Sequence, residues 1–136
     1  MGDRLLTALT HGDFQPGNML VDGNKVWLID WEYSGRRQVG YDALVYALRS
    51  RFPDGLAARM GQMLDGSGAM ESLPLSLGLD WQDAAHRRAH LWLFLLEELA
   101  LHLAENANPR FNRLSEGLAT LQQEITDIKR TGKGNS

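Results

Sequence analysis

Cysteine is absent from this sequence, which excludes both a disulfide framework and a zinc site built on thiolates. An excess of basic charge is absent as well: the formal net charge is −3, so nothing in the charge favours a nucleic-acid partner. The longest apolar run, Leu91–Leu96, is far shorter than the about 20 residues that a membrane-spanning helix needs. The segment Met1–Asp13 lacks the long apolar core of a signal peptide. We therefore expect a cytoplasmic protein with no membrane span.

The length of 136 residues suits one compact domain rather than two. We expect this domain to cover residues 1–130 and a polar, flexible tail to occupy residues 131–136. Apolar residues at helical spacing predict four helices in the later part of the chain. Their approximate ranges are Tyr41–Arg51, Gly55–Leu64, Asp80–Glu105 and Arg110–Lys129. The segment Leu5–Leu9 resembles the end of a helix or a lead-in, and Gly35–Gly40 is expected to be a loop.

A β-hairpin is predicted in the first third of the chain. Two short apolar runs, Met19–Val21 and Lys25–Ile29, flank the tripeptide Asp22-Gly23-Asn24. Asp-Gly between apolar runs favours a tight turn, because the turn needs residues that tolerate positive φ. The preceding segment, His11–Asn18, contains two glycines and a proline and is expected to be a loop.

Three oxygen-bearing side chains are expected to meet at the open end of this hairpin. Because the strands are antiparallel, Asn18 before the first strand and Asp30 after the second must lie close together, and Asp13 shares the loop with Asn18. Mg²⁺ prefers carboxylate and amide oxygens. Phosphoryl transfer requires metal ions that bridge the phosphates and a group that deprotonates the acceptor hydroxyl. The alternative is that these residues only cap turns, as Asp and Asn often do.

The motif formed by His11, Asp13 and Asn18 resembles the HxDxxxxN catalytic loop of the aminoglycoside phosphotransferase and choline kinase family. Members of this family are similar in fold to the large lobe of protein kinases, and Leu28-Ile29-Asp30 resembles the metal-binding segment of those kinases. The resemblance implies that Asp13 is the catalytic base and that Asn18 and Asp30 hold Mg²⁺. It further implies that His11 braces the loop, that ATP is the donor, and that a small molecule with a hydroxyl group is the acceptor.

A second segment resembles one particular subgroup of this family. The segment Asp30–Ser34, followed by Gly40-Tyr41-Asp42, is similar to the DWEY region of choline and ethanolamine kinases. The resemblance implies that Asp42 opens a helix and hydrogen-bonds the backbone of the catalytic loop. Two further residues each allow two interpretations. Glu32 either lies near the metal or the acceptor, or is a solvated charge. Tyr33 either lines an acceptor pocket or packs in the interior.

One residue differs from the choline kinase pattern in a way that affects which acceptor the chain could bind. Those enzymes carry a carboxylate on the helix after the late aspartate, where it attracts the quaternary ammonium, whereas this chain has Arg49. A cation there suits a sugar, a sugar phosphate or another anionic acceptor better than choline. Arg49 is one of four arginines that form either a basic patch or ordinary solvated surface: Arg36, Arg37, Arg49 and Arg51.

Other conspicuous side chains are expected to have structural roles. The four tryptophans are expected in the core rather than as substrate platforms: Trp27, Trp31, Trp81 and Trp92. Three histidines on the long helix are expected in packing or at the surface rather than on zinc: His86, His90 and His102.

The family's enzymes also carry a small N-terminal lobe, with a glycine-rich strand pair and a lysine that grips the nucleotide phosphates. Only ten residues precede His11. We therefore expect an α+β fold, mostly α: a protein-kinase-like large lobe with a catalytic loop, a short β-hairpin and several helices, but without the small lobe. The leading hypothesis is the C-terminal part of an ATP-dependent small-molecule kinase, inactive by itself. The alternatives are a half completed by another chain, a choline or ethanolamine kinase-like enzyme, a non-catalytic pseudokinase-like module, and a metal-dependent hydrolase.

Overall fold

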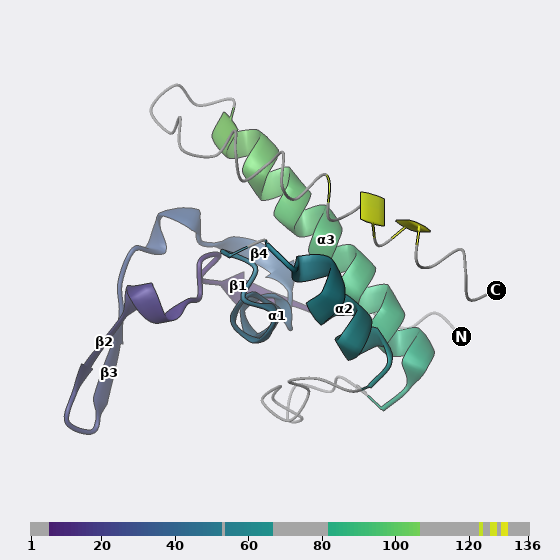
Figure 1. Ribbon diagram of the computed structural model, residues 1–136. Coiled ribbons are helices and arrows are strands. Elements are labelled where there is room, and N and C mark those ends of the chain that lie inside the picture. Colours follow the sequence, from purple (N-terminus) through teal and green to yellow (C-terminus); the bar gives the residue numbers. More distant parts are fainter. Residues whose placement is uncertain are drawn as a thin grey trace.

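The computed structural model describes residues 6–52, 54–66, 82–106, 123, 126–127 and 129–130 of the chain. This part of the protein is α+β and mostly helical, with two two-stranded antiparallel sheets and three α-helices (Figure 1). The strands are β1 Thr7–Thr10, β2 Met19–Asp22, β3 Lys25–Leu28 and β4 Gly35–Gln38. The α-helices are α1 Tyr41–Leu48, α2 Leu56–Leu64 and α3 Ala84–Asn106, and short 3-10 helices occupy Pro16–Asn18 and Trp31–Tyr33.

The predicted hairpin is present as β2 and β3. Its register pairs Met19 with Leu28 and Asp22 with Lys25, and Gly23 in the turn has a φ of 57°. The hairpin extends away from the helices (Figure 1). Its side chains are therefore largely exposed, and Trp27 is 58% accessible to solvent. The prediction of a core position is wrong for Trp27, because neither face of this short ribbon packs against the helices.

A second strand pair, β1 with β4, was not predicted. Its register pairs Thr7 with Gln38 and Thr10 with Gly35. The segment expected to end a helix is thus a strand from Thr7 onward, and part of the expected loop Gly35–Gly40 is its partner. Each strand has four residues, too few for an alternating pattern to stand out, and the pairing joins segments that are distant in sequence.

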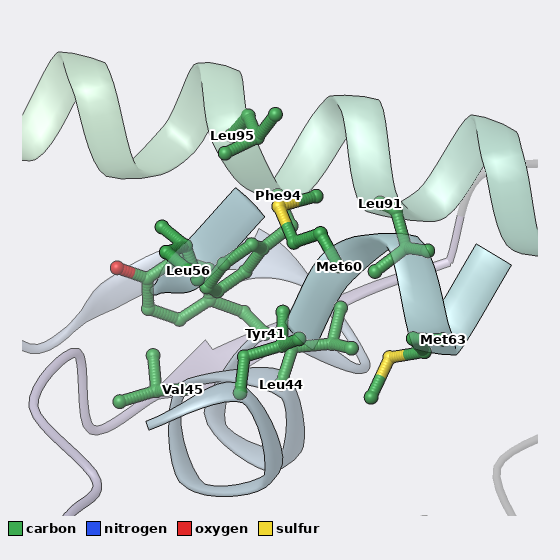
Figure 2. Close-up of a cluster of buried hydrophobic side chains, with 10 residues drawn as sticks. Tyr41, Leu44, Val45, Leu56, Met60, Met63, Leu91, Phe94 and Leu95 are labelled. Carbon is green, nitrogen blue, oxygen red and sulfur yellow. The ribbon is translucent and has the colours of Figure 1, made fainter. Parts of the chain in front are cut away.

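The core lies where the three helices meet (Figure 2). Leu91 and Phe94 project from α3 toward the side chains of α1 and α2. Ten apolar residues are buried in this cluster: Tyr41, Leu44, Val45, Leu48, Leu56, Met60, Met63, Leu91, Phe94 and Leu95. Trp92 packs against it as expected, whereas Trp31 is 48% exposed. Trp81 lies outside the described residues. No helix in the described part of the chain is long and apolar enough to cross a membrane.

Helix ends differ from the predictions by a few residues. Helix α1 stops at Leu48 rather than Arg51, because Arg49 adopts the left-handed conformation with φ 52° and ψ 46°. Helix α3 begins after Asp83, whose Oδ1 accepts hydrogen bonds from the amides of Ala85 at 2.8 Å and His86 at 3.2 Å. Asp80, most of the expected helix at 110–129 and the expected tail at 131–136 lie outside the described residues.

Candidate active site

The loop between β1 and β2 is anchored from below by the first turn of α1. Asp42 accepts hydrogen bonds from the amide of His11 at 2.7 Å, through Oδ2, and from the amide of Gly12 at 3.0 Å, through Oδ1. A carboxylate in this position also interacts favourably with the positive end of the helix dipole. The start of the loop is thereby held in place by α1.

Gly12 is at a position that accepts no other residue. Its φ is 90°, a conformation that side chains rarely adopt. A Cβ atom there would overlap the carbonyl oxygen of Tyr33 and lie 2.9 Å from the Tyr33 Cβ. The close approach brings the 3-10 helix Trp31–Tyr33 against the loop, so Tyr33 contacts the loop through its backbone. The neighbouring side chain of Glu32 is exposed.

His11 connects the loop to the segment that follows β3. The imidazole is buried, with 2% exposure, and packs edge-on against the ring of Trp31 at 4.6 Å. Its Nε2 lies 2.7 Å from the carbonyl oxygen of Ile29, and its Nδ1 accepts the amide hydrogen of Asp13 at 3.2 Å. A ring protonated at Nε2 satisfies both bonds.

The carboxylate of Asp13 is surrounded by hydrogen-bond donors. Asn18 donates through Nδ2 to both the main-chain oxygen and Oδ2 of Asp13, at 2.9 and 2.8 Å. Oδ1 accepts from Gln15 Nε2 at 2.9 Å and from Arg51 Nε at 2.6 Å. Burial raises the pKa of the Asp13 carboxyl, but the hydrogen bond and charge of Arg51 and the bonds from Asn18 and Gln15 outweigh it. The pKa therefore lies below its ordinary value.

The two ends of the hairpin lie side by side, as predicted from its antiparallel strands. The amide of Ile29 donates to the carbonyl oxygen of Asn18 at 3.0 Å, and Asp30 follows directly. Asp30 is exposed and adopts the left-handed conformation, with φ 58°. The amide nitrogen of Asn18 is committed to Asp13, so its Oδ1 is the atom available to a cation. Within the described ranges, no group of three or more histidine or acidic side chains is arranged to hold a metal ion.

Arg51 and Glu98 were missed as components of the site. Arg51 was expected in a basic patch or at the solvated surface, but its side chain is only 14% exposed. Its Nη1 donates to Glu98 at 2.8 and 3.1 Å, and its Nη2 donates to the carbonyl oxygen of Gly12. Glu98 is fully buried and also accepts a hydrogen bond from the hydroxyl of Tyr41. Burial lowers the pKa of Arg51, but the charge of Glu98 and the interactions with Tyr41 and Asp13 together outweigh it, so the pKa is raised and the guanidinium stays ionised.

One signal in the sequence pointed to this pair. Glu98 follows the apolar run of α3 and, by its spacing from Phe94 and Leu91, falls on the same helix face. An acidic residue on a buried face needs a cationic or hydrogen-bonding partner. The sequence alone does not say which arginine fills that role.

A second set of hydrogen bonds, separate from the Arg51–Glu98 pair, joins β4 to α3. The backbone amide of Gln38 donates to Glu97 Oε1 at 2.9 Å, and its side chain bonds the carbonyl oxygen of His90 at 3.0 Å and the His90 ring at 2.6 Å. His90 is buried, and its ring lies 4.4 Å from that of His86, so the packing role expected for His90 is confirmed. Burial raises the pKa of Glu97 despite the bonds from Gln38.

The four arginines fall in two places. Arg36 and Arg37 lie on β4, where they donate to Thr7 Oγ1 at 3.1 Å and Thr10 Oγ1 at 2.8 Å. Arg49 and Arg51 instead line a pocket of about 410 Å³ beside the loop. Its wall is formed by Gln15, Pro16, Val45, Tyr46, Ala47, Arg49, Arg51 and Phe52. No single basic patch is formed by the four.

Comparison with known families gives one result. A model of the phosphotransferase enzyme family matches residues 3–75, which is more than half of the chain. The matched stretch contains the loop, the hairpin, α1 and α2. No curated protein and no solved structure matches the chain.

Proposed function

The chain belongs to the phosphotransferase enzyme family, as its resemblance to aminoglycoside phosphotransferases predicted, and we propose that it transfers a phosphoryl group from ATP to a hydroxyl of a small molecule in the cytoplasm. Phosphoryl transfer depends on positioning and electrostatic stabilisation more than on covalent chemistry by the protein. The proposal therefore depends on how firmly the candidate residues are held.

The position of Asp13 carries the proposal. Its carboxylate is 17% exposed and is oriented by Asn18, while Asp42 holds the two residues before it. A base must be fixed within hydrogen-bond reach of the acceptor and still be reachable from solvent. This combination of a rigid frame and an accessible carboxylate supports Asp13 as the group that orients the acceptor hydroxyl.

In the proposed reaction the acceptor hydroxyl oxygen attacks the terminal phosphorus of ATP. Its proton passes to the Asp13 carboxylate, the bond between the terminal phosphorus and the bridging oxygen breaks, and ADP leaves. Asn18 and Arg51 contribute by fixing the orientation of the two carboxylate oxygens. His11 acts indirectly, since it holds the backbone of Asp13 against the end of β3.

The donor set suits Mg²⁺. Asn18 has its side-chain oxygen left for a cation and Asp30 adds a carboxylate from the adjacent strand end, while Mg²⁺ commonly takes only one or two protein ligands and completes its shell with phosphates and water. Under the proposal Asn18 and Asp30 hold the ion. When bound, it would neutralise charge on the nucleotide phosphates. The glycine-rich strands and the lysine that grip these phosphates would come from another segment or another chain.

A non-catalytic binding module is the second candidate. It is favoured by the hydrogen bond and ion pair from Arg51 to Asp13, because a carboxylate whose pKa is lowered is a weaker base. The two candidates agree on nucleotide binding and differ on turnover.

The test uses the product of the complete coding sequence. We expect Mg²⁺-dependent thermal stabilisation by ATP, and transfer to at least one hydroxyl compound in a panel of alcohols, sugars and sugar phosphates. Asp13→Ala should retain nucleotide binding and reduce transfer by roughly 10²–10⁴-fold. Asp30→Ala should abolish the Mg²⁺-dependent stabilisation.

Asp22→Ala, at the exposed end of β2 beside the turn, is the matched control and should change neither result. Transfer that persists at the normal rate in Asp13→Ala would refute the assigned base. Nucleotide binding without transfer to any acceptor would support the second candidate. Absence of both nucleotide binding and phosphoryl transfer would contradict the kinase proposal and its alternative.

A further inference from the structure

The pocket beside the loop has the size of a small-molecule site. Its volume is about 410 Å³, and ligand pockets commonly measure about 300–1,000 Å³. One wall is the loop segment Gln15-Pro16, and the other is the end of α1 with the turn after it, from Val45 to Phe52.

The pocket lies one hydrogen bond from the candidate base. Gln15 and Arg51 both line it, and both donate to Oδ1 of Asp13, at 2.9 and 2.6 Å. A molecule in the pocket would therefore contact the two side chains that bind Oδ1 of Asp13.

Most of the wall is apolar and aromatic. Tyr46 and Phe52 are 46% and 62% exposed, and the ring of Tyr46 lies 6.0 Å from that of Phe14. Exposed aromatic side chains beside an apolar wall favour a ligand with a planar or apolar body.

The charge of the pocket is positive. No acidic residue is among the described residues that line it, and two arginines are. The charge of Arg51 is balanced by Asp13 and Glu98. Arg49 is exposed, and its side chain forms no ion pair within the described part of the chain. The unbalanced cation is thus Arg49.

The backbone of Arg49 supplies an independent argument. Its left-handed conformation just past the end of α1 is one that glycine adopts most easily. The chain does use glycine for positive φ at other turns, including Gly55 and Gly66. Among the described residues, the non-glycine positions with positive φ are Arg49 and Asp30, and Asp30 is the candidate metal ligand. Strained positions of this kind cluster at functional sites, since the fold alone would be served by glycine.

We propose that this pocket binds the acceptor and that the acceptor is an oxyanion: a small molecule with a carboxylate or phosphate that pairs with Arg49, an apolar body against Tyr46 and Phe52, and a hydroxyl that faces Asp13. The assignment of the ligand as acceptor rests on the proposed kinase function. The pocket's preference for an oxyanion can be measured without turnover.

The binding test uses four probes with the chain itself: para-(hydroxymethyl)benzoate, para-(hydroxymethyl)phenyl phosphate, the neutral para-(hydroxymethyl)benzamide, and choline. Calorimetry or NMR titration should show the two anions binding at least about tenfold more tightly than the amide, the usual scale for a charge-assisted hydrogen bond. Choline should bind most weakly. The two anions together distinguish a carboxylate from a phosphate preference.

Arg49→Gly provides the decisive variant, because it should increase the stability of the fold and decrease the binding of anions. It should raise Tm, since glycine fits the left-handed position, and it should remove the roughly tenfold preference for anions. Arg88→Gln, which removes an exposed arginine from α3, is the control and should leave both unchanged. A lower Tm for Arg49→Gly would overturn the argument from backbone strain, and an unchanged anion preference would overturn the proposal.

The outcomes separate this inference from the kinase proposal. Anion binding that depends on Arg49, without phosphoryl transfer to any acceptor, supports the pocket and contradicts the kinase function. Transfer that proceeds equally well to neutral and anionic acceptors, and survives Arg49→Gly with unchanged KM, supports the kinase and overturns the oxyanion acceptor.

Discussion

Asp13 is held at 2.6 Å by Nε of Arg51, and the other side of the same guanidinium is bound to the fully buried carboxylate of Glu98 on α3. The loop that carries the candidate base is thus connected to the helical core through one arginine. Movement of α3 relative to α1 would reposition Asp13, so the stability of the core and the geometry of the site are coupled.

Removal of one partner of the buried pair should be strongly destabilising. Arg51→Ala leaves the fully buried carboxylate of Glu98 without its guanidinium partner, which costs about 3–5 kcal/mol of unfolding free energy. Glu98→Ala should cost less, because the guanidinium of Arg51 keeps its ion pair with Asp13. The double variant Arg51→Met with Glu98→Leu should recover most of this loss, because an apolar pair of similar size leaves no buried charge at this position. Urea denaturation measures all three.

An exposed ion pair serves as the control for that experiment. Arg130 and Asp127 lie 4.0 Å apart with side chains 77% and 44% exposed, so Asp127→Ala should change stability by less than about 1 kcal/mol. Single substitutions at Arg51 and Glu98 that cost no more than this would contradict the proposed connection.

The lowered pKa of Asp13 predicts a specific pH dependence. Because the folded-state pKa lies below the ordinary value of 3.8, the carboxylate adds stability that is fully present above that value and is lost as pH falls through the folded pKa. The stability difference between the wild type and Asp13→Asn should therefore shrink below pH 3.8. Urea denaturation across the acid range measures it, and a difference that stays constant would contradict the prediction.

Glu97 should show the opposite slope. Burial raises its pKa above the ordinary value of 4.5, so its contribution to stability increases as pH falls from the folded pKa toward 4.5. Compared with Glu97→Gln, the wild type should gain relative stability over this range. Urea denaturation at several pH values measures this. Curves of unfolding free energy against pH that run parallel for the two proteins would contradict the raised pKa of Glu97.

Two glycines in the same loop should respond differently to a methyl group. Gly12→Ala forces an unfavourable φ and a clash with the Tyr33 backbone, so it should displace the loop and destabilise the fold by more than about 1 kcal/mol. At Gly17 the φ is not positive and a Cβ would meet no atom within 4 Å, so Gly17→Ala should have little effect on Tm. Equal Tm values for the two variants would contradict the role assigned to Gly12.

The helical core can be tested with a pair of leucines. Leu44 is fully buried between the helices, and Leu44→Ala should reduce the unfolding free energy by about 2–5 kcal/mol. Leu103 on α3 is 51% exposed, so Leu103→Ala should stay within about 0.5 kcal/mol of the wild type. Comparable losses at both positions would contradict the assignment of Leu44 to the core and of Leu103 to the surface.

The sequence determined the features that depend on neighbours along the chain. Gly23 allowed the tight hairpin turn because glycine tolerates its positive φ, and the hairpin then brought Asn18 beside Ile29 and Asp30. Helical periodicity located α1, α2 and α3 to within a few residues. The loop motif, the hairpin and the segment Asp30–Ser34 were together sufficient to recognise the family, because their spacing is a local property.

Tertiary structure alone decided the pairing of β1 with β4, the choice of Arg51 as the partner of Glu98, and the pocket at Arg49. Each depends on groups distant in sequence that meet only after the helices pack. Whether an arginine is solvated or buried in an ion pair follows from the desolvation of its surroundings, which no local pattern encodes. The spacing of His11, Asp13 and Asn18 thus predicted which residues form the candidate site, while the packing of α1 against α3 decided what holds Asp13 in place.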